Sequence, residues 1–182
     1  TSEVVQELLD YQVDGILFAS VAITNDITTR CEAAGIPVVL FNRGQEGEAH
    51  TEITSDNLEG GRDAARFLAA GGHRRIAHVA GWQGASTGRD RAEGFRRGLA
   101  ESGLEPVAVI DGMYDRDTAA AAARRLMEGP APPDAIFVGN DHMAFAVMDA
   151  LRSGLGLRVP GDVSVVGFDD VPLAAWPAYD LT

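Results

Sequence analysis

Short, mainly apolar runs alternate with segments of helical periodicity along nearly the whole chain, and this alternation limits the fold more than any other feature. The apolar runs, which we expect to be strands, are Gly15–Ala19, Pro37–Phe41, Ile76–Ala80, Val107–Ile110, Ala135–Val138 and Val163–Phe168. Helical patterns fill the intervals at residues 27–34, 57–70, 89–102, 117–128 and 141–153, and glycine closes each of them. Strands that are apolar throughout are typical of parallel sheets covered by helices on both faces. With right-handed crossovers, the pattern predicts a doubly wound α/β protein.

The charges exclude several classes of function. Arg and Lys together number 15 against 27 Asp and Glu, the net charge is −12, and every cation is Arg. Without Lys, the chain has neither a Walker-type phosphate loop nor a lysine for a Schiff base with a pyridoxal cofactor. The negative charge argues against contact of this segment with DNA, RNA or an anionic membrane, because each of these attracts a cationic surface.

Cysteine content and apolar length add further limits. The single cysteine, Cys31, excludes an internal disulfide and a cysteine-built zinc site, and it is compatible with a reducing compartment. The longest apolar stretch, Ile16–Ile23, is too short to cross a bilayer, so we expect no membrane contact. The chain opens in a helical pattern and closes without a final element, so we expect both ends to be truncated.

Polar residues follow nearly every predicted strand. Ligands of an open parallel sheet bind beyond the carboxyl ends of its strands, so these residues are the candidates for a binding site. They are Ser20, Asn42, Arg43, residues 81–91 and 111–114, Asn140, Asp141, Asp169 and Asp170. Their hydroxyl, amide, carboxylate and guanidinium groups, with a few aromatic rings, suit a polyhydroxylated or heterocyclic small molecule.

One motif raises an enzymatic alternative. Residues 84–88 read Gly-Ala-Ser-Thr-Gly, which is the G-x-S-x-G pattern of a serine hydrolase, with Ser86 as nucleophile and His142 as the base. The serine comes several residues after the preceding strand, however, whereas a nucleophile elbow places it directly at the strand end. No G-x-G-x-x-G sequence follows a strand, and the histidines show no metal-ligand spacing, so we expect no cofactor and no metal site.

Several short motifs follow one another in a fixed order along nearly the whole chain. They are Val13–Leu17, Ile36–Val39, Asp56-Asn57 with Gly60-Gly61, Gly72–Ile76, Arg91–Phe95, Pro133–Ile136, Asn140–Ala144 and Val159–Asp170. Each motif alone is weak, but the ordered series is specific. In this series the chain closely resembles the effector-binding domain of the LacI/GalR family of bacterial transcription regulators.

The resemblance implies two similar doubly wound α/β subdomains that bind an effector between the carboxyl ends of their parallel strands. It places residues 1–81 in the amino-terminal subdomain and residues 82–182 in the carboxyl-terminal one, and it implies a helix-turn-helix domain that is absent from this chain. Such a protein is a cytoplasmic repressor and not an enzyme. It forms a homodimer, binds a sugar or purine-like effector, and contacts operator DNA through the absent domain. A periplasmic sugar-binding protein of a transporter is the second hypothesis, and a hydrolase using Ser86 is the third.

The resemblance also assigns effector contacts residue by residue. Arg91 of the R-x-x-G-F pattern is the strongest of them, because its guanidinium group can donate to two ligand oxygens. Thr87, Tyr114, Asn140 and Asp169 match the other contact positions.

Two further residues are added to this set from their position. Ser20 follows a predicted strand, and Asp141 lies in a first helical turn, where an acidic residue also suits the helix dipole. We interpret Asp56 as the cap of the helix that begins at Asn57. Ala85 cannot hydrogen bond where some relatives carry a polar residue, so the class of effector stays open.

Overall fold

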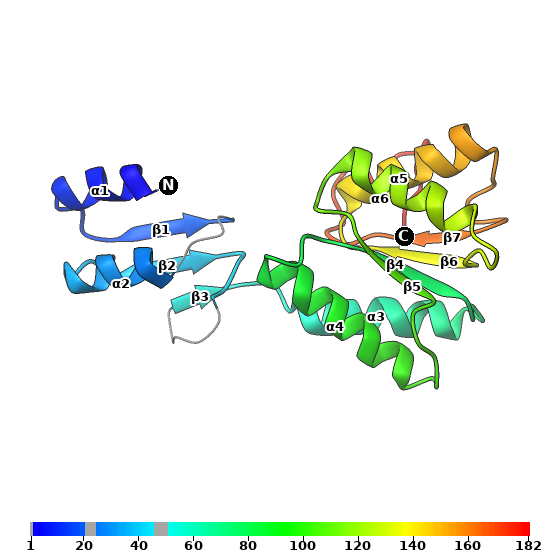
Figure 1. Cartoon of the computed structure of the whole chain (residues 1–182), viewed down its shortest axis with the longest axis horizontal. Helices are drawn as coiled ribbons and strands as arrows, with labels where there is room; N and C mark the ends of the chain where they lie inside the picture. The colour runs from blue at the N-terminus through cyan, green and yellow to red at the C-terminus, as the bar shows by residue number, and fades with distance from the viewer. Residues whose placement is uncertain (1, 21–24, 46–50) are drawn as a thin grey trace. The chain divides into compact units, whose positions relative to one another are not determined.

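The structure is a computed structural model that describes residues 2–20, 25–45 and 51–182. The chain forms two compact units, the first comprising Thr1–Ser55 with Gly84–Thr87 and the second Asp56–Gln83 with Gly88–Thr182. Each unit contains one parallel sheet and its helices, which confirms the predicted parallel α/β class (Figure 1). Within the described ranges, no helix has the length and apolar character needed to span a membrane.

The first unit has a three-stranded sheet. Its elements are α1 (Ser2–Asp10), β1 (Ile16–Ala19), α2 (Asn25–Ala33), β2 (Val38–Phe41) and β3 (Thr51–Ile53), and the strand order is β1-β2-β3. The short strand β3 was not predicted. Its sequence, Thr-Glu-Ile, lacks an apolar run, and all three of its residues are exposed.

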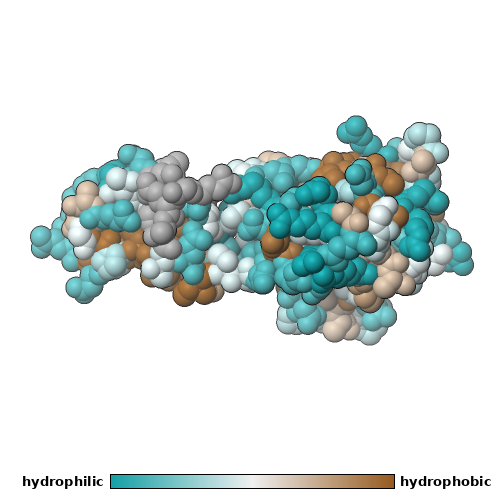
Figure 2. All heavy atoms as spheres, turned by 90° about the horizontal axis from the view of Figure 1, so that it is seen from below, coloured by the Kyte–Doolittle hydropathy of each residue, from teal (hydrophilic) through white to brown (hydrophobic). Residues whose placement is uncertain are grey.

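The helices of the first unit cover one face of its sheet. Val5 of α1 and Cys31 of α2 pack with Phe18 and Leu40, which point to the same face of their strands. Leu17, which alternates with the buried residues of β1, is 62% exposed. Hydrophobic surface of this unit is visible in Figure 2. In the part of this unit that the structure describes, the buried side chains of the strands and helices thus share one face of the sheet.

The second unit has a four-stranded sheet with helices on both faces. Its elements are α3 (Asn57–Ala70), β4 (Ile76–Ala80), α4 (Ser86–Ala100), β5 (Ala108–Asp111), α5 (Arg116–Met127), β6 (Ala135–Val138), α6 (Asp141–Asp149) with a π-helical continuation at Ala150–Gly154, and β7 (Ser164–Val166). The strand order is β5-β4-β6-β7, and all pairs are parallel. Strands β4 and β6 are buried at every residue, as their mainly apolar sequences predict.

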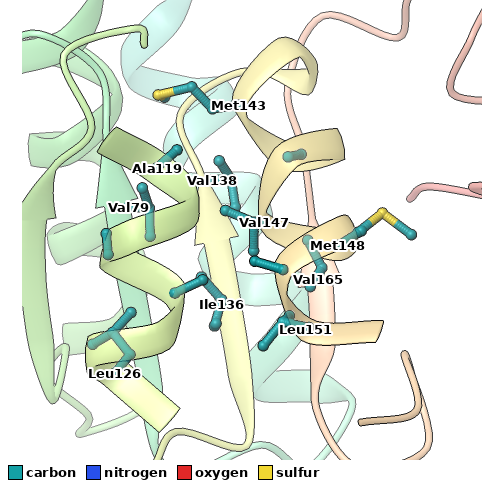
Figure 3. Close-up of a cluster of buried hydrophobic side chains, with 14 of the residues drawn as sticks. Val79, Ala119, Leu126, Ile136, Val138, Met143, Val147, Met148, Leu151 and Val165 are labelled. Atoms are coloured by element: carbon teal, nitrogen blue, oxygen red, sulfur yellow. The ribbon is translucent and has the colours of Figure 1, made fainter. Parts of the chain in front are cut away.

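Two cores lie on opposite faces of this sheet. On one face, α5 and α6 point residues such as Leu126 and Val147 toward Ile136 and Val165 of the strands (Figure 3). On the other face, Leu68 of α3 and residues of α4 form a second cluster with strand residues. The sheet is thus held rigidly between two layers, and its strand ends form a fixed support.

The division between the units differs from the one expected after residue 81. Strand β4 hydrogen bonds with β5 and β6, and α3 packs on the same sheet, so both elements belong to the second unit. The chain changes unit between Ser55 and Asp56. Periodicity locates a strand but does not identify its partners, so it carries no information about which sheet a strand joins.

Candidate functional site

A glycine directly follows each of two strands in the second unit, and this allows the two backbones to lie close together. Gly81 follows β4 directly, and Gly139 follows β6. A Cβ atom on Gly139 would lie only 2.6 Å from the backbone nitrogen of Gly81. A Cβ atom on Gly81 would overlap the ring of Tyr114, which lies against this backbone. The glycines therefore create a close-packed backbone edge at the carboxyl ends of the strands.

Arg91 of α4 is buried at this edge, with only 6% of its surface exposed. Its Nη1 donates to the carbonyl oxygen of Gly139 at 2.6 Å, and its Nε donates to Oδ1 of Asn57 at 2.9 Å. Its Nη2 lies 3.4 Å from Oδ1 of Asp169. The guanidinium carbon lies 3.7 Å from the centre of the Phe168 ring. Contacts from three different segments thus hold one buried cation in a single orientation.

The turn after β7 carries Asp169 in an unusual backbone conformation. The φ angle is +115° at Asp169 and +54° at Asp170, in a region that residues other than glycine rarely adopt. The Asp169 side chain is 39% exposed. Partial burial raises the pKa of its carboxyl group, while the nearby Arg91 charge acts in the opposite direction. Asp169 is therefore an accessible acceptor beside a buried donor.

A buried carboxylate supports this turn. Asp141, which is 2% exposed, accepts a hydrogen bond from the backbone N–H of Val171 at 2.9 Å. Its own backbone N–H donates to the carbonyl oxygen of Phe168 at 2.8 Å, and a Cβ atom on Gly167 would overlap its carboxylate. Burial raises the pKa of Asp141, with the backbone hydrogen bonds opposing this shift. These contacts are with the turn that carries Asp169.

Asn140 and Tyr114 lie at the same strand ends. Asn140 is the N-cap of α6, because its Oδ1 accepts from the backbone N–H of Met143 at 2.9 Å, and its amide N–H groups are donors for other partners. Tyr114 is half-buried and lies over Gly81. The second unit therefore brings together five of the seven predicted residues. These are Arg91, Tyr114, Asn140, Asp141 and Asp169.

The other two predicted residues, Ser20 and Thr87, belong to the first unit, because the first two residues of α4 group with it and the rest of that helix with the second unit. Ser20 is exposed, and its Oγ accepts a hydrogen bond from Nδ2 of Asn42 at 2.9 Å. Thr87 is buried in the first turn of α4. Ser86, the nucleophile of the hydrolase hypothesis, accepts a hydrogen bond from the backbone N–H of Gly44 at 2.9 Å. That partner is an amide, which cannot activate a hydroxyl group as an imidazole does.

Sequence reasoning missed two partners of Arg91. The helical pattern identifies Asn57 only as the start of a helix, and the apolar run identifies Phe168 only as the end of a strand. Both contacts join segments far apart in the chain, and periodicity carries no information about such pairs. Their only sequence signal is that each lies within a motif of the resemblance.

Comparison with known proteins identifies the family of this chain. Residues 65–182 match the family described as the periplasmic binding protein-like domain, and they make up more than half of the chain. The chain belongs to this family. Its relatives are LacI-type transcription regulators, which confirms the resemblance predicted from the sequence motifs.

Three relatives illustrate the match to LacI-type regulators. A probable HTH-type transcriptional repressor, ExuR of Bacillus subtilis, is 35% identical over 87% of this chain and 48% of its own length. The crystal structure of a LacI transcriptional regulator from a Rhodococcus species has a TM-score of 0.87 at 31% identity, covering 98% of this chain and 66% of that one. The complex of the regulator CelR with cellobiose has a TM-score of 0.85 at 35% identity, covering 94% of this chain and 54% of that one.

The chain spans about half the length of the curated relatives it matches. These relatives are transcription regulators rather than enzymes or transport proteins.

Proposed function

We propose that this LacI-type chain is the effector-sensing core of a transcriptional repressor. The observation that carries the proposal is the buried Arg91 at the strand ends, paired with the partly exposed Asp169. An effector that binds one arrangement of the protein more tightly than another shifts the equilibrium between them, and no covalent chemistry is needed. The backbone hydrogen bond to Ser86 supports a sensor over a hydrolase.

The proposed effector is a sugar that lies against the strand ends. A guanidinium group beside a carboxylate presents donors and acceptors side by side, which complements neighbouring hydroxyl groups on a sugar ring. Asn140 adds amide donors, and Tyr114 adds an aromatic ring on which a sugar or base can stack. The relative solved with cellobiose supports a sugar. Thr87 and Ser20 are proposed to contribute hydroxyl groups from the first unit.

Operator DNA is the second proposed partner, and we assign its contacts to a domain outside these residues. The net charge of −12 disfavours direct DNA contact by this chain. The chain covers about half of relatives named as HTH-type regulators. The proposed protein is a cytoplasmic homodimer that uses neither a cofactor nor a metal and is not an enzyme.

Calorimetry and thermal-shift measurements on the intact protein test this proposal. The ligands are cellobiose, a panel of monosaccharides, and purine bases. We expect one sugar to bind, to change operator affinity in a gel-shift assay, and to lose binding in Arg91→Ala, while Ser86→Ala retains it. Unchanged sugar affinity in Arg91→Ala would remove this residue from the site. An esterase activity that disappears in Ser86→Ala would overturn the sensor proposal.

A further inference from the structure

We infer that Asn57 is a positioning residue that sets the orientation of the Arg91 guanidinium group for the effector. This inference rests on the proposed function, in which Arg91 contacts the ligand. Asn57 itself is 3% exposed, so the inference gives it no contact with the effector. The role of Asn57 is to fix which edge of the guanidinium group faces the other partners of Arg91.

The chemistry of the Arg91 side chain explains how one hydrogen bond can do this. Nε carries a single N–H, which lies in the plane of the guanidinium group. Its donation to Oδ1 of Asn57 at 2.9 Å fixes that plane, while Nη1 meets the Gly139 carbonyl and Nη2 points to Asp169. Both residues of the Asn57–Arg91 pair are nearly excluded from solvent, so water cannot easily replace the amide.

The backbone holds Asn57 and Arg91 at a fixed separation. Asn57 is the first residue of α3, and Arg91 lies in α4. The two helices touch through glycine, because a Cβ atom on Gly61 would overlap the Arg91 carbonyl oxygen and one on Gly94 would overlap that of Leu58. Backbone-to-backbone contact leaves little freedom for the helices to slide. The geometry of the pair is therefore built into the helix packing.

An amide suits this position better than a carboxylate. Asp169 already supplies one negative charge to Arg91. A second carboxylate at position 57 would hold the guanidinium equally well but would make the group of three side chains net negative. The neutral oxygen of Asn57 orients the cation and leaves its charge balance unchanged.

The experiment compares Asn57→Leu, which keeps the size but removes the acceptor, with Asn57→Asp, which keeps the acceptor. The first readout needs no ligand: NMR of the Arg91 Nε–H group, which should exchange slowly with water in the wild type. We expect exchange at least tenfold faster in Asn57→Leu and near the wild-type rate in Asn57→Asp. Equal exchange rates in the wild type and Asn57→Leu would overturn the inference.

The second readout is the affinity for cellobiose, or for the sugar that binds in the panel above, measured by calorimetry. We expect Asn57→Leu to lose tenfold or more. The matched control is Asp56→Ala, which removes the cap of the same helix, where Asp56 accepts from the backbone N–H of Glu59 at 3.0 Å, without touching Arg91. A comparable loss of affinity in Asp56→Ala would show that loosening of α3 is responsible and would refute positioning. If no sugar binds the wild type, the sugar proposal fails, and the exchange measurement still decides the role of Asn57.

Discussion

A titration of stability against pH tests the environment of His78 in the middle of β4. This histidine is 1% exposed, its ring stacks on Phe137 at 4.7 Å between centroids, and the tilted ring of Phe95 lies 5.1 Å from it. Its Nδ1 lies 3.0 Å from the carbonyl oxygen of Phe137, whereas Nε2 has no hydrogen-bond partner among the described residues. Protonation would place a positive charge in the protein interior without water, and this burial lowers the pKa of His78 to about 4, although the hydrogen bond with the Phe137 carbonyl opposes the shift.

This lowered pKa makes the free energy of unfolding depend on pH. An unfolded histidine titrates near pH 6.5, so between about pH 6.5 and 4 the unfolded chain binds a proton that the folded chain does not. The difference between a pKa of 6.5 in the unfolded chain and about 4 in the folded chain corresponds to about 3 kcal/mol. The stabilisation is complete above pH 6.5, falls by about 2 kcal/mol by pH 5, and is lost as the pH approaches 4.

Urea denaturation followed by tryptophan fluorescence measures this effect, because Trp82 and Trp176 both lie in the second unit with His78. The comparison is with His78→Phe, which keeps the stacked ring but cannot titrate. Between pH 7 and 5, we expect the wild type to lose about 2 kcal/mol more than this variant. Parallel curves for the wild type and His78→Phe would refute the reasoning.

Three further predictions concern packing, thiol reactivity and surface charge. Gly94→Ala should lower the free energy of unfolding of the second unit by about 2 kcal/mol, because its Cβ would overlap the carbonyl oxygen of Leu58. The control in the same urea assay is Gly129→Ala, whose Cβ would lie 3.4 Å from its nearest backbone neighbour. Equal losses in the two variants would contradict the packing argument. Cys31 is fully buried and burial raises its pKa, so Ellman's reagent should label it only when urea opens the first unit, and rapid labelling of the native chain would count against this core. Glu101→Gln removes a carboxylate shared by two arginines of α3. We expect a small loss of stability that disappears at about 1 M salt, because salt screens exposed ion pairs. A loss that persists at this salt concentration would mean that these ion pairs are not screened.

The sequence predicted most of the second unit because its central strands, β4 and β6, are buried on both faces. A fully buried strand such as β6 is apolar at every position, and that leaves an unbroken signal. Strand β3 leaves no such signal, because its residues are exposed and it is held by backbone pairing with β2. The pairing of β4 with β5 and β6 was equally invisible, since hydrogen bonds between distant strands do not depend on side-chain pattern.

The candidate site was predictable to the extent that it follows from topology. The rule that ligands bind at the carboxyl ends of parallel strands selects Asn140 and Asp169, and the motif resemblance adds Arg91. Neither source of information describes the conformation of a turn. The positive φ at Asp169 and the buried carboxylate of Asp141 beneath it are properties of the folded chain alone.

The two polar side chains that hold Arg91 differ in burial, and their contributions to stability differ accordingly. The Asn57 bond is almost fully buried and involves a charged donor, so its loss costs about 1.5–3 kcal/mol. The Asp169 side chain is 39% exposed and 3.4 Å away, so solvent screens this pair to about 1 kcal/mol or less. Asn57→Leu should therefore lower the free energy of unfolding more than Asp169→Asn, although only the latter removes a charge.

A double-mutant cycle of these two variants, measured by urea denaturation, separates orientation from charge. Once Asn57 no longer fixes the plane of the guanidinium group, Nη2 of Arg91 has no set direction toward Asp169. The double variant should then be less destabilised than the sum of the two single variants. Strictly additive losses, or a larger loss from Asp169→Asn than from Asn57→Leu, would mean that charge rather than the buried amide holds Arg91 in place.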